Sequence, residues 1–333
     1  MGNSTRGNCE VTAVKPLHVA VLMGGWSAER EVSLTSGRGV AAALDKLGHR
    51  VVAIDMERDV ATKLSLAAPD VVFNALHGTP GEDGSIQGLL DIMGLPYTHS
   101  GLTTSVIAID KELTKQALVP HGIRMPQGKV VDSETLYAGD PLPRPYVLKP
   151  VNEGSSVGVA IVSDESNYGN PIARDAEGPW KHFDRLLAEP FIRGRELTTA
   201  VIGGADGKAL AVTELKIDSG FYDYEHKYTD GITTHVCPAE IPEDVAAACL
   251  RMAEEAHRLL GCKGCSRSDF RWDDEKGVEG LYLLEVNTQP GMTPLSLVPE
   301  QARHVGMSYE ALVQRLVEEA LKEAAARRGD NEE

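Results

Sequence analysis

Short apolar runs alternate with amphipathic stretches over the first hundred residues, and this alternation most narrows what the chain can fold into. The first apolar run ends in Gly24-Gly25, and the helical pattern after it stops at Gly48. The predicted strands cover residues 18–23, 50–56 and 70–76, and the predicted helices cover residues 32–47 and 85–93. Strands that alternate with helices predict a parallel α/β sheet.

Two loops of this predicted sheet are candidate walls of a binding site. In open α/β sheets, ligands lie beyond the carboxyl ends of the strands. The sequence puts residues 24–29 and the pair His77-Gly78 at such ends.

The remainder of the chain reads as further units of mixed structure. We expect a second unit to begin near Arg124 and to contain a Gly- and Ser-rich turn at residues 149–159. Such a turn between two strands suits a mobile hairpin whose backbone amides cradle phosphates. The later predicted strands cover residues 146–149, 197–202, 209–217, 268–272 and 281–286, and the later predicted helices cover residues 109–118, 243–260 and 309–325. A long polar-aromatic loop is expected from Asp218 onward.

Size, charge and cysteine usage exclude several classes of protein. A chain of 333 residues exceeds what one hydrophobic core usually supports, so we expect two or three domains and a cleft between them. A net charge of -16 opposes binding to nucleic acid. The apolar runs are too short to span a bilayer, and the polar N-terminal stretch does not read as a signal peptide. An odd number of cysteines without a secretion signal favours free thiols and a cytoplasmic protein.

Cys262 and Cys265 form a CxxC pair that raises the question of metal or redox chemistry. No second pair or nearby histidine completes a zinc set, and no thioredoxin-like strand and helix flank the pair. A structural interpretation is therefore favoured over the metal and redox alternatives.

A metal site is suggested near the end of the predicted strand at residues 281–286. Glu285 and Asn287 project from the same face of an extended chain, and Asp269 lies on another predicted strand. Together these side chains offer oxygen ligands of the kind that magnesium prefers. A solvated carboxylate pair on a strand explains the spacing about equally well. No P-loop and no GxGxxG motif is present, so an ATP site would be of another kind.

Several motifs in a fixed order resemble those of the D-alanine:D-alanine ligases, which are ATP-grasp enzymes. The matching stretches are GGWSAEREVS at 24–33, ALHG at 75–78, GEDG at 81–84, Lys149-Pro150, EGSSVG at 153–158, FYDYEHKY at 221–228, EVNTQPGMT at 285–293 and SLVP at 296–299. The resemblance implies an α/β fold of three domains, with a nucleotide cleft between the central and C-terminal domains. The polar stretch at 1–16 is expected to be a disordered tail. The resemblance implies domains at 17–110, 111–200 and 201–333, the last one carrying the catalytic and metal residues.

The resemblance also implies roles for residues in the nucleotide cleft. Lys111, Lys149 and Lys227 would contact the phosphates of ATP, and Glu189 and Glu196 would bind its adenine and ribose. Asp269, Glu285 and Asn287 would hold two Mg²⁺ ions, with Mn²⁺ as an alternative ion. Each of these charges taken alone would be read as a solvated surface group.

The resemblance implies a second set of residues for two D-alanine substrates. Glu29 and His77 would receive the first D-alanine, and Ser296 with the amide of Leu297 would bind the carboxylate of the second. Arg267 and the amide of Gly291 would form the oxyanion hole, while Ser155 and Tyr228 would close loops over the site. D-alanyl phosphate would be the intermediate, the product would serve peptidoglycan synthesis, and the enzyme is expected to be a cytoplasmic homodimer. The interpretation of each lone hydroxyl or histidine as an ordinary loop residue remains the alternative.

Two rival functions stay open at this point. A ligase that uses D-lactate or D-serine as the second substrate would share most motifs, although Tyr228 favours D-alanine because ester-forming ligases generally lack the Lys-Tyr pair. A catalytically inactive nucleotide-binding protein is the rival of another class. It would be expected to have lost at least one of Asp269, Glu285, Asn287, Lys149 and Arg267, all of which are present.

Overall fold

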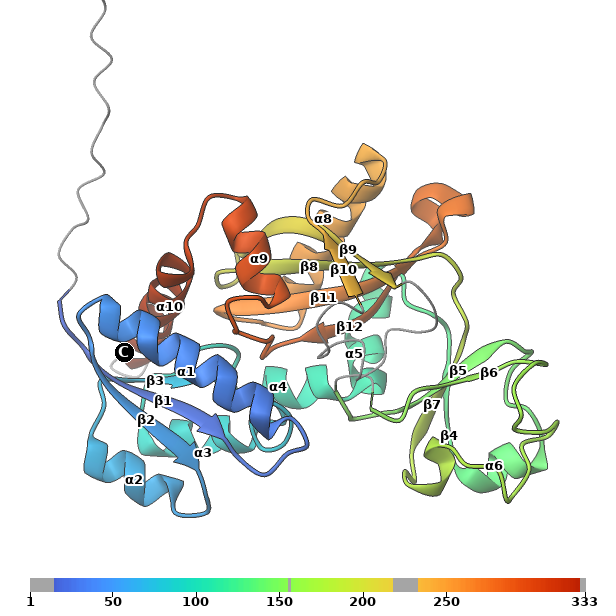
Figure 1. Ribbon diagram of the computed structural model, residues 1–333, viewed down its shortest axis with the longest axis horizontal. Helices are drawn as coiled ribbons and strands as arrows, with labels where there is room; N and C mark the ends of the chain where they lie inside the picture. The colour runs from blue at the N-terminus through green and yellow to red at the C-terminus, as the bar shows by residue number, and fades with distance from the viewer. Residues whose placement is uncertain (1–14, 155–156, 218–232, 330–333) are drawn as a thin grey trace, which may run out of the picture.

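The computed structural model describes residues 15–154, 157–217 and 233–329, and Figure 1 shows these residues arranged around three β-sheets. The first sheet has the strand order β2-β1-β3, the second β4-β7-β5-β6 and the third β10-β9-β8-β11-β12. Each sheet is made from one continuous part of the chain, which agrees with an organisation in three units. Ser155, Lys227 and Tyr228 lie outside the described residues.

The first sheet is parallel and buried on both faces, as its continuous apolar strands predict. It consists of β1 (His18–Gly24), β2 (Arg50–Met56) and β3 (Val71–Asn74). Val19 and Val21 of β1 point into a core shared with α1 (Arg30–Lys46), whereas Ala20 and Leu22 point into a core shared with α2 (Val60–Ala67) and α3 (Ser85–Met93). The predicted parallel α/β unit is confirmed.

The second and third sheets are antiparallel. The second contains β4 (Lys129–Val131), β5 (Tyr146–Pro150), β6 (Ala160–Val162) and β7 (Leu186–Pro190), and it packs on α6 (Ser133–Ala138) and η2 (Pro179–Lys181). The third contains β8 (Arg195–Ile202), β9 (Lys208–Ile217), β10 (Thr233–Val236), β11 (Cys265–Trp272) and β12 (Leu281–Asn287). Helix α8 (Glu243–Leu259) covers one face of the third sheet, and α9 (Leu297–His304) covers the other. Strand β8 begins before the predicted boundary at residue 200, and the domain boundaries remain a prediction.

The predicted helix at residues 109–118 is α5 (Lys111–Leu118), which begins two residues later than expected. Asp110 before it has extended backbone dihedrals, and its carboxylate accepts hydrogen bonds from the amides of Glu112 and Leu113. These capping bonds start the helix after Asp110, although the apolar pattern continues across this residue. The preceding helix α4 (Leu102–Ile109) was not predicted.

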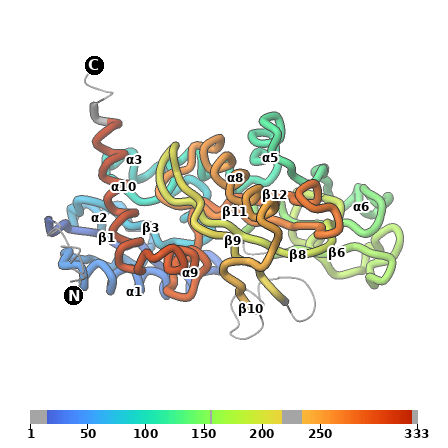
Figure 2. The backbone as a smooth tube through the Cα atoms, turned by 90° about the horizontal axis from the view of Figure 1, so that it is seen from above, coloured from blue at the N-terminus to red at the C-terminus, as the bar shows by residue number. Residues whose placement is uncertain are grey.

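The C-terminal helix α10 (Tyr309–Gly329) returns to the first unit, and both views place it over the first sheet (Figures 1 and 2). Leu312, Val313 and Leu316 share a core with β1 and α1. Lys46 of α1 forms an ion pair with Glu310, at 2.6 Å. The first and third units are thus joined by a common core.

The remaining short helices are η1 (Val119–His121) and η3 (Asp274–Gly280). None of the helices in the described part of the chain is long and apolar enough to cross a membrane. Cys262 and Cys265 are both buried as free thiols, and burial raises the pKa of each to about 12.

Candidate active site

The loop between β1 and α1 is held against the end of β3 by a buried serine. The hydroxyl of Ser33 accepts from the amide of Gly24 and donates to the carbonyl of Ala75, both at 2.8 Å. Gly24 and Gly25 have φ values of +77° and +83°, which favour glycine and turn the chain sharply at the end of the strand. This turn brings Glu29, just before α1, to the carboxyl end of the sheet, where it is buried.

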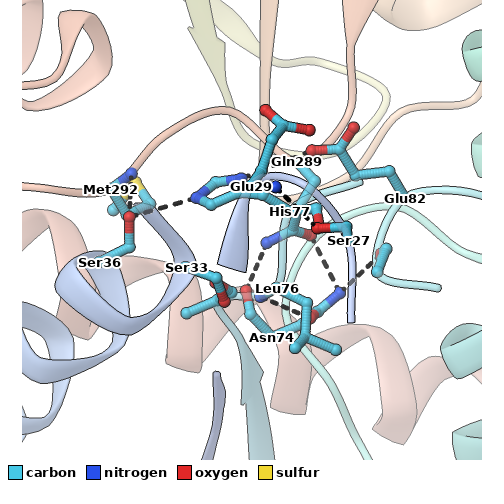
Figure 3. A network of polar contacts seen from close by, with 12 residues as sticks. Ser27, Glu29, Ser33, Ser36, Asn74, Leu76, His77, Glu82, Gln289 and Met292 are labelled. Atoms are coloured by element: carbon cyan, nitrogen blue, oxygen red, sulfur yellow. Dashed lines mark hydrogen bonds and ion pairs between the residues drawn. The ribbon is translucent and has the colours of Figure 1, made fainter. Parts of the chain in front are cut away.

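His77 lies in the loop after β3 and contacts both α1 and the loop between β1 and α1 (Figure 3). Its Nε2 lies 3.2 Å from the hydroxyl of Ser36, and its Nδ1 lies 3.5 Å from Oε1 of Glu82. The hydroxyl of Ser27 donates to the carbonyl oxygen of His77 at 2.7 Å. The imidazole is therefore fixed in position beside two carboxylates, those of Glu29 and Glu82.

Glu82 has an electrostatic environment that disfavours its charge. Burial raises the pKa of Glu82, and the negative charge of Glu29 raises it further, while His77 acts in the opposite direction without cancelling the rise. Two neighbouring acidic groups and a histidine can together receive an ammonium group and its proton.

The loop after β12 reaches the same place from the third unit. Gln289 and Asn74 are joined twice: the Asn74 amide donates to Oε1 of Gln289 at 3.2 Å, and the Gln289 amide donates to the Asn74 carbonyl. The amide of Met292 contacts the hydroxyl of Ser36 at 3.4 Å, as Figure 3 shows. The loop that carries Gly291 is thus attached to β3 and α1 of the first unit.

Gly291 and Ser296 lie against each other at the start of α9. A Cβ added to Gly291 would lie 3.0 Å from the Ser296 hydroxyl, so a side chain there would have to displace it. That hydroxyl accepts from the amide of Thr293 at 3.1 Å. Leu297, the first residue of α9, is buried against Leu215. The lack of a side chain at Gly291 therefore lets the Ser296 hydroxyl lie close to its backbone.

A pocket lies where the second and third sheets face each other. Lining residues from the second unit and the segment before it are Lys111, Pro126, Val147, Lys149, Pro150, Glu153, Val157, Val159, Glu189 and Pro190. Lining residues from the third sheet and its approach are Phe191, Ile192, Glu196, Asp269, Arg271, Leu284 and Glu285. A lining that combines apolar side chains with several charged groups suits a ligand with an apolar ring and an anionic tail.

Glu189 binds two lysines at the edge of this pocket. Lys149 Nζ lies 2.6 Å from Oε2 of Glu189, and Lys115 contacts Oε1 of the same carboxylate. Burial alone would raise the pKa of Glu189, but the two lysines outweigh it and hold the pKa below its ordinary value. Burial also lowers the pKa of Lys115, although Glu189 opposes that change.

Lys111 connects the turn between β5 and β6 to β12. Its ammonium donates to the carbonyl of Glu153 at 2.6 Å and lies 3.5 Å from Oε2 of Glu285. Burial lowers the pKa of Lys111, and the nearby Lys149 adds to that effect against the opposing charge of Glu285. A lysine so placed can meet an anionic group entering between the hairpin and the third sheet.

The three predicted metal ligands lie on paired strands. Asp269 is the register partner of Glu285 in the antiparallel pair of β11 and β12, and Arg267 is the partner of Asn287. The side-chain amide of Asn287 lies 3.0 Å from Oδ2 of Asp269. Two carboxylates and one amide oxygen suit Mg²⁺, which commonly binds one or two carboxylates together with substrate phosphates. In the described residues no three histidine, cysteine or acidic side chains form a metal-binding group, so the amide is a necessary member of this set.

The structure brings most of the predicted residues together in two neighbouring clusters. Glu29 and His77 lie at the end of the first sheet, and Gly291 lies against Ser296 at the start of α9. The pocket is lined by the described nucleotide and metal candidates Lys111, Lys149, Glu189, Glu196, Asp269 and Glu285, with Glu196 3.5 Å from Arg271. Lys115 and Glu82 were missed as site residues. Glu82 stands within the quoted GEDG motif, whereas no pattern in the sequence singles out Lys115.

Comparison with known proteins identifies related sequences over nearly the whole chain. Residues 57–100 match the family described as D-ala D-ala ligase N-terminus, and residues 129–318 match D-ala D-ala ligase C-terminus. The D-alanine–D-alanine ligase of Rhizorhabdus wittichii is 74% identical over 94% of this chain and 99% of that protein. The corresponding ligase of Sphingopyxis alaskensis is 75% identical over 92% of this chain and 98% of that protein.

Solved structures show the same architecture. The D-alanine–D-alanine ligase of Bacillus anthracis in complex with ATP superposes with a TM-score of 0.75 at 27% identity, covering 93% of this chain and 99% of that one. The ligase of Coxiella burnetii gives a TM-score of 0.76 at 26% identity, covering 95% and 97%. The arrangement of three units predicted from the sequence is therefore that of these ligases.

Proposed function

The chain belongs to the D-alanine–D-alanine ligase family, and on that premise we propose that it joins two D-alanine molecules into D-alanyl-D-alanine while converting ATP to ADP and phosphate. This proposal rests on two different groups of residues, one suited to an amino acid and the other to a nucleotide. A pair of carboxylates beside His77 faces the end of the first sheet, and a lysine-lined pocket opens between the other two sheets. Ligation of a zwitterion at the expense of a nucleotide needs both.

The reaction proceeds in two steps. A carboxylate oxygen of the first D-alanine attacks the γ-phosphorus of ATP, and the bond to the β,γ-bridging oxygen breaks to release ADP. The amine of the second D-alanine then attacks the carbonyl carbon of the D-alanyl phosphate. The tetrahedral intermediate collapses with loss of phosphate, and the amine loses its proton.

ATP occupies the pocket between the second and third sheets. Lys111 and Lys149 contact its phosphates, and Glu189 and Glu196 bind the adenine and ribose side, because acidic groups can accept from an exocyclic amine and from hydroxyls. Lys227 is assigned to the γ-phosphate on the family resemblance, and it lies outside the described residues.

Mg²⁺ fits the oxygen donors of Asp269, Glu285 and Asn287. When bound, two such ions, or Mn²⁺ in their place, neutralise charge on the phosphoryl oxygens. The side chains of β11 and β12 orient the triphosphate end of the nucleotide toward the first D-alanine. Arg267 and the amide of Gly291 donate to the oxyanion of the tetrahedral intermediate.

The two D-alanine molecules bind at opposite sides of the reacting centre. Glu29 receives the ammonium of the first D-alanine beside His77, and Glu82 holds the imidazole in place. Ser296 and the amide of Leu297 bind the carboxylate of the second. Ser155 and Tyr228, both outside the described residues, are assigned to closing the site against water, which protects the acyl phosphate from hydrolysis.

The cellular setting follows the same proposal. The dipeptide serves peptidoglycan synthesis in the cytoplasm, and a net charge of -16 opposes binding to nucleic acid. We infer a homodimer, supported by apolar side chains that α4 exposes: Leu102 is 42% exposed and Val106 is 39% exposed.

A substrate panel tests the proposed reaction against its rivals. Purified protein is supplied with ATP, Mg²⁺ and D-alanine, alone or with D-lactate or D-serine, and the products are identified by mass spectrometry. We expect the D-alanine dipeptide to dominate in every mixture at neutral pH. A predominant ester with D-lactate, or a mixed dipeptide with D-serine, would reassign the second substrate.

A further inference from the structure

Lys115 is a buried cation next to the proposed nucleotide pocket, but it does not line that pocket. Its side chain is 9% exposed, and unlike Lys111 and Lys149 it is absent from the pocket lining. Its ammonium donates to the carbonyl of Pro126 at 2.6 Å and contacts Oε1 of Glu189. Lys115 thus contacts two residues that line the pocket, Pro126 and Glu189, and of these two only Glu189 is charged.

The backbone is shaped to let this contact form. A Cβ added to Gly128 would lie 3.2 Å from Nζ of Lys115, 2.8 Å from Cγ of Glu189 and 2.5 Å from the carbonyl oxygen of Ala188. The last of these atoms belongs to the backbone of β7 and cannot turn away. Glycine at position 128 therefore provides the space in which the lysine and the carboxylate meet.

The carboxylate of Glu189 has one lysine on each oxygen. Oε2 pairs with Lys149, which lines the pocket, and Oε1 pairs with Lys115, which does not. The side chain of Glu189 is only 3% exposed, so water contributes little to stabilising its charge. A buried carboxylate that loses its single cation is strongly destabilised.

We propose that Lys115 is a positioning residue that neutralises Glu189, so that Lys149 can turn from Glu189 toward the phosphates of ATP. This inference rests on the proposed ATP site. Without Lys115, Lys149 would be the only ion-pair partner of Glu189 among the described residues, and moving it toward a nucleotide would leave a buried charge uncompensated. With Lys115 in place, Glu189 keeps a cation beside it when Lys149 turns toward the phosphates.

The test is the affinity of the full-length protein for a non-hydrolysable ATP analogue, measured by calorimetry. We expect Lys115→Met to weaken binding by about tenfold or more, and Lys115→Arg to restore most of it. In steady-state kinetics the KM for ATP should rise more than kcat falls. Lys263→Met, which removes a lysine that is paired with Glu323 and is absent from the pocket lining, serves as the control and should bind like wild type.

A double-mutant cycle with Glu189→Gln separates this role from a merely structural one. If Lys115 acts through the charge of Glu189, Lys115→Met should change the affinity by less than about twofold in the Glu189→Gln background. The double variant also keeps the test available if Lys115→Met alone unfolds, since it contains no unpaired carboxylate at position 189.

Three outcomes would overturn the inference. These are an unchanged affinity in Lys115→Met, an equal loss of affinity with and without Glu189→Gln, and an equal loss in the Lys263→Met control. Failure of the wild-type protein to bind the analogue at all would instead overturn the proposed ATP site, and the inference with it.

Discussion

Arg267 holds Asp269 through two parallel hydrogen bonds, from Nε to Oδ1 at 2.8 Å and from Nη2 to Oδ2 at 2.7 Å. The two residues stand on the same face of β11, and Thr198 adds a third donor to Oδ1 at 2.6 Å. The guanidinium is planar and matches the carboxylate in both atoms, so each side chain fixes the orientation of the other. The proposed oxyanion donor and a proposed metal ligand are thereby aligned as one unit.

Loss of Arg267 tests its proposed contact with the tetrahedral intermediate. Arg267→Ala should lower kcat by about 10²-fold or more, because a donor to a developing oxyanion acts mainly in the transition state. The measurement is steady-state kinetics with D-alanine varied at saturating ATP. Arg267→Lys should recover only part of the rate, since an ammonium cannot make both hydrogen bonds to Asp269. A change confined to KM would assign Arg267 to binding of the substrate in its ground state.

Substitution of the proposed metal ligands should separate activity from folding. Asn287→Ala and Glu285→Gln should each abolish turnover while leaving the thermal unfolding temperature close to that of wild type, because both side chains are only partly buried and fill little of the core. Activity is measured over a titration of Mg²⁺, and unfolding is followed by circular dichroism. Near-normal rates at saturating Mg²⁺ would show that these residues do not hold the metal.

The raised pKa of Glu82 predicts a pH-dependent cost to stability. Burial raises this pKa above the ordinary 4.5, so as pH increases past that value the unfolded chain loses the proton first and the folded state loses stability relative to it. Glu82→Gln cannot ionise. The free energy of unfolding of Glu82→Gln should therefore become larger relative to that of wild type as pH rises from below 4.5 toward neutrality.

Urea unfolding of both proteins at several pH values measures this difference. A difference that stays constant with pH, or one that shrinks as pH rises, would contradict the assigned environment of Glu82.

Arg30 and Asp55, an exposed ion pair on the same unit, offer the opposite case: hydrogen bonding to Arg30 lowers the pKa of Asp55. Asp55→Asn should thus be less stable than wild type at pH values above the lowered pKa of Asp55, and this difference should disappear as pH falls through that pKa.

Two glycines, Gly194 and Gly48, test how closely the backbone just before β8 approaches the end of β11. Gly194 has φ +95°, and a Cβ there would lie 2.0 Å from the carbonyl oxygen of Trp272. Gly48 has φ +86° with nothing within 4 Å of such a Cβ. Gly48→Ala should cost about 1–2 kcal/mol of unfolding free energy from backbone strain alone. Gly194→Ala should cost clearly more, because the clash is with backbone. Equal losses in urea unfolding would contradict the close approach at Gly194.

The sequence predicts the elements of this fold well where the periodic pattern and its stop signals agree. The strand at residues 50–56 and the helix at residues 85–93 were placed at their observed limits because Gly or polar residues bound both. The start of α5 after Asp110 was predicted two residues early, because capping hydrogen bonds rather than a change in apolar spacing set it. The return of α10 onto the first sheet is a long-range packing event that no local pattern encodes.

The candidate site was predicted unevenly for similar reasons. Residues within dense motifs, such as His77 and Asn287, could be assigned roles because their neighbours are distinctive. Lys115 could not, because its importance comes from burial and from sharing Glu189 with Lys149, which only the folded chain reveals.

The stoichiometry of one reaction tests the proposed function most directly. Purified protein is incubated with D-alanine, ATP and Mg²⁺, and ADP and D-alanyl-D-alanine are quantified together over time. One dipeptide per ADP is the predicted result, with neither formed from L-alanine. ADP release without dipeptide, or no turnover of ATP with D-alanine, would contradict the assignment of this chain as a D-alanine-joining ligase.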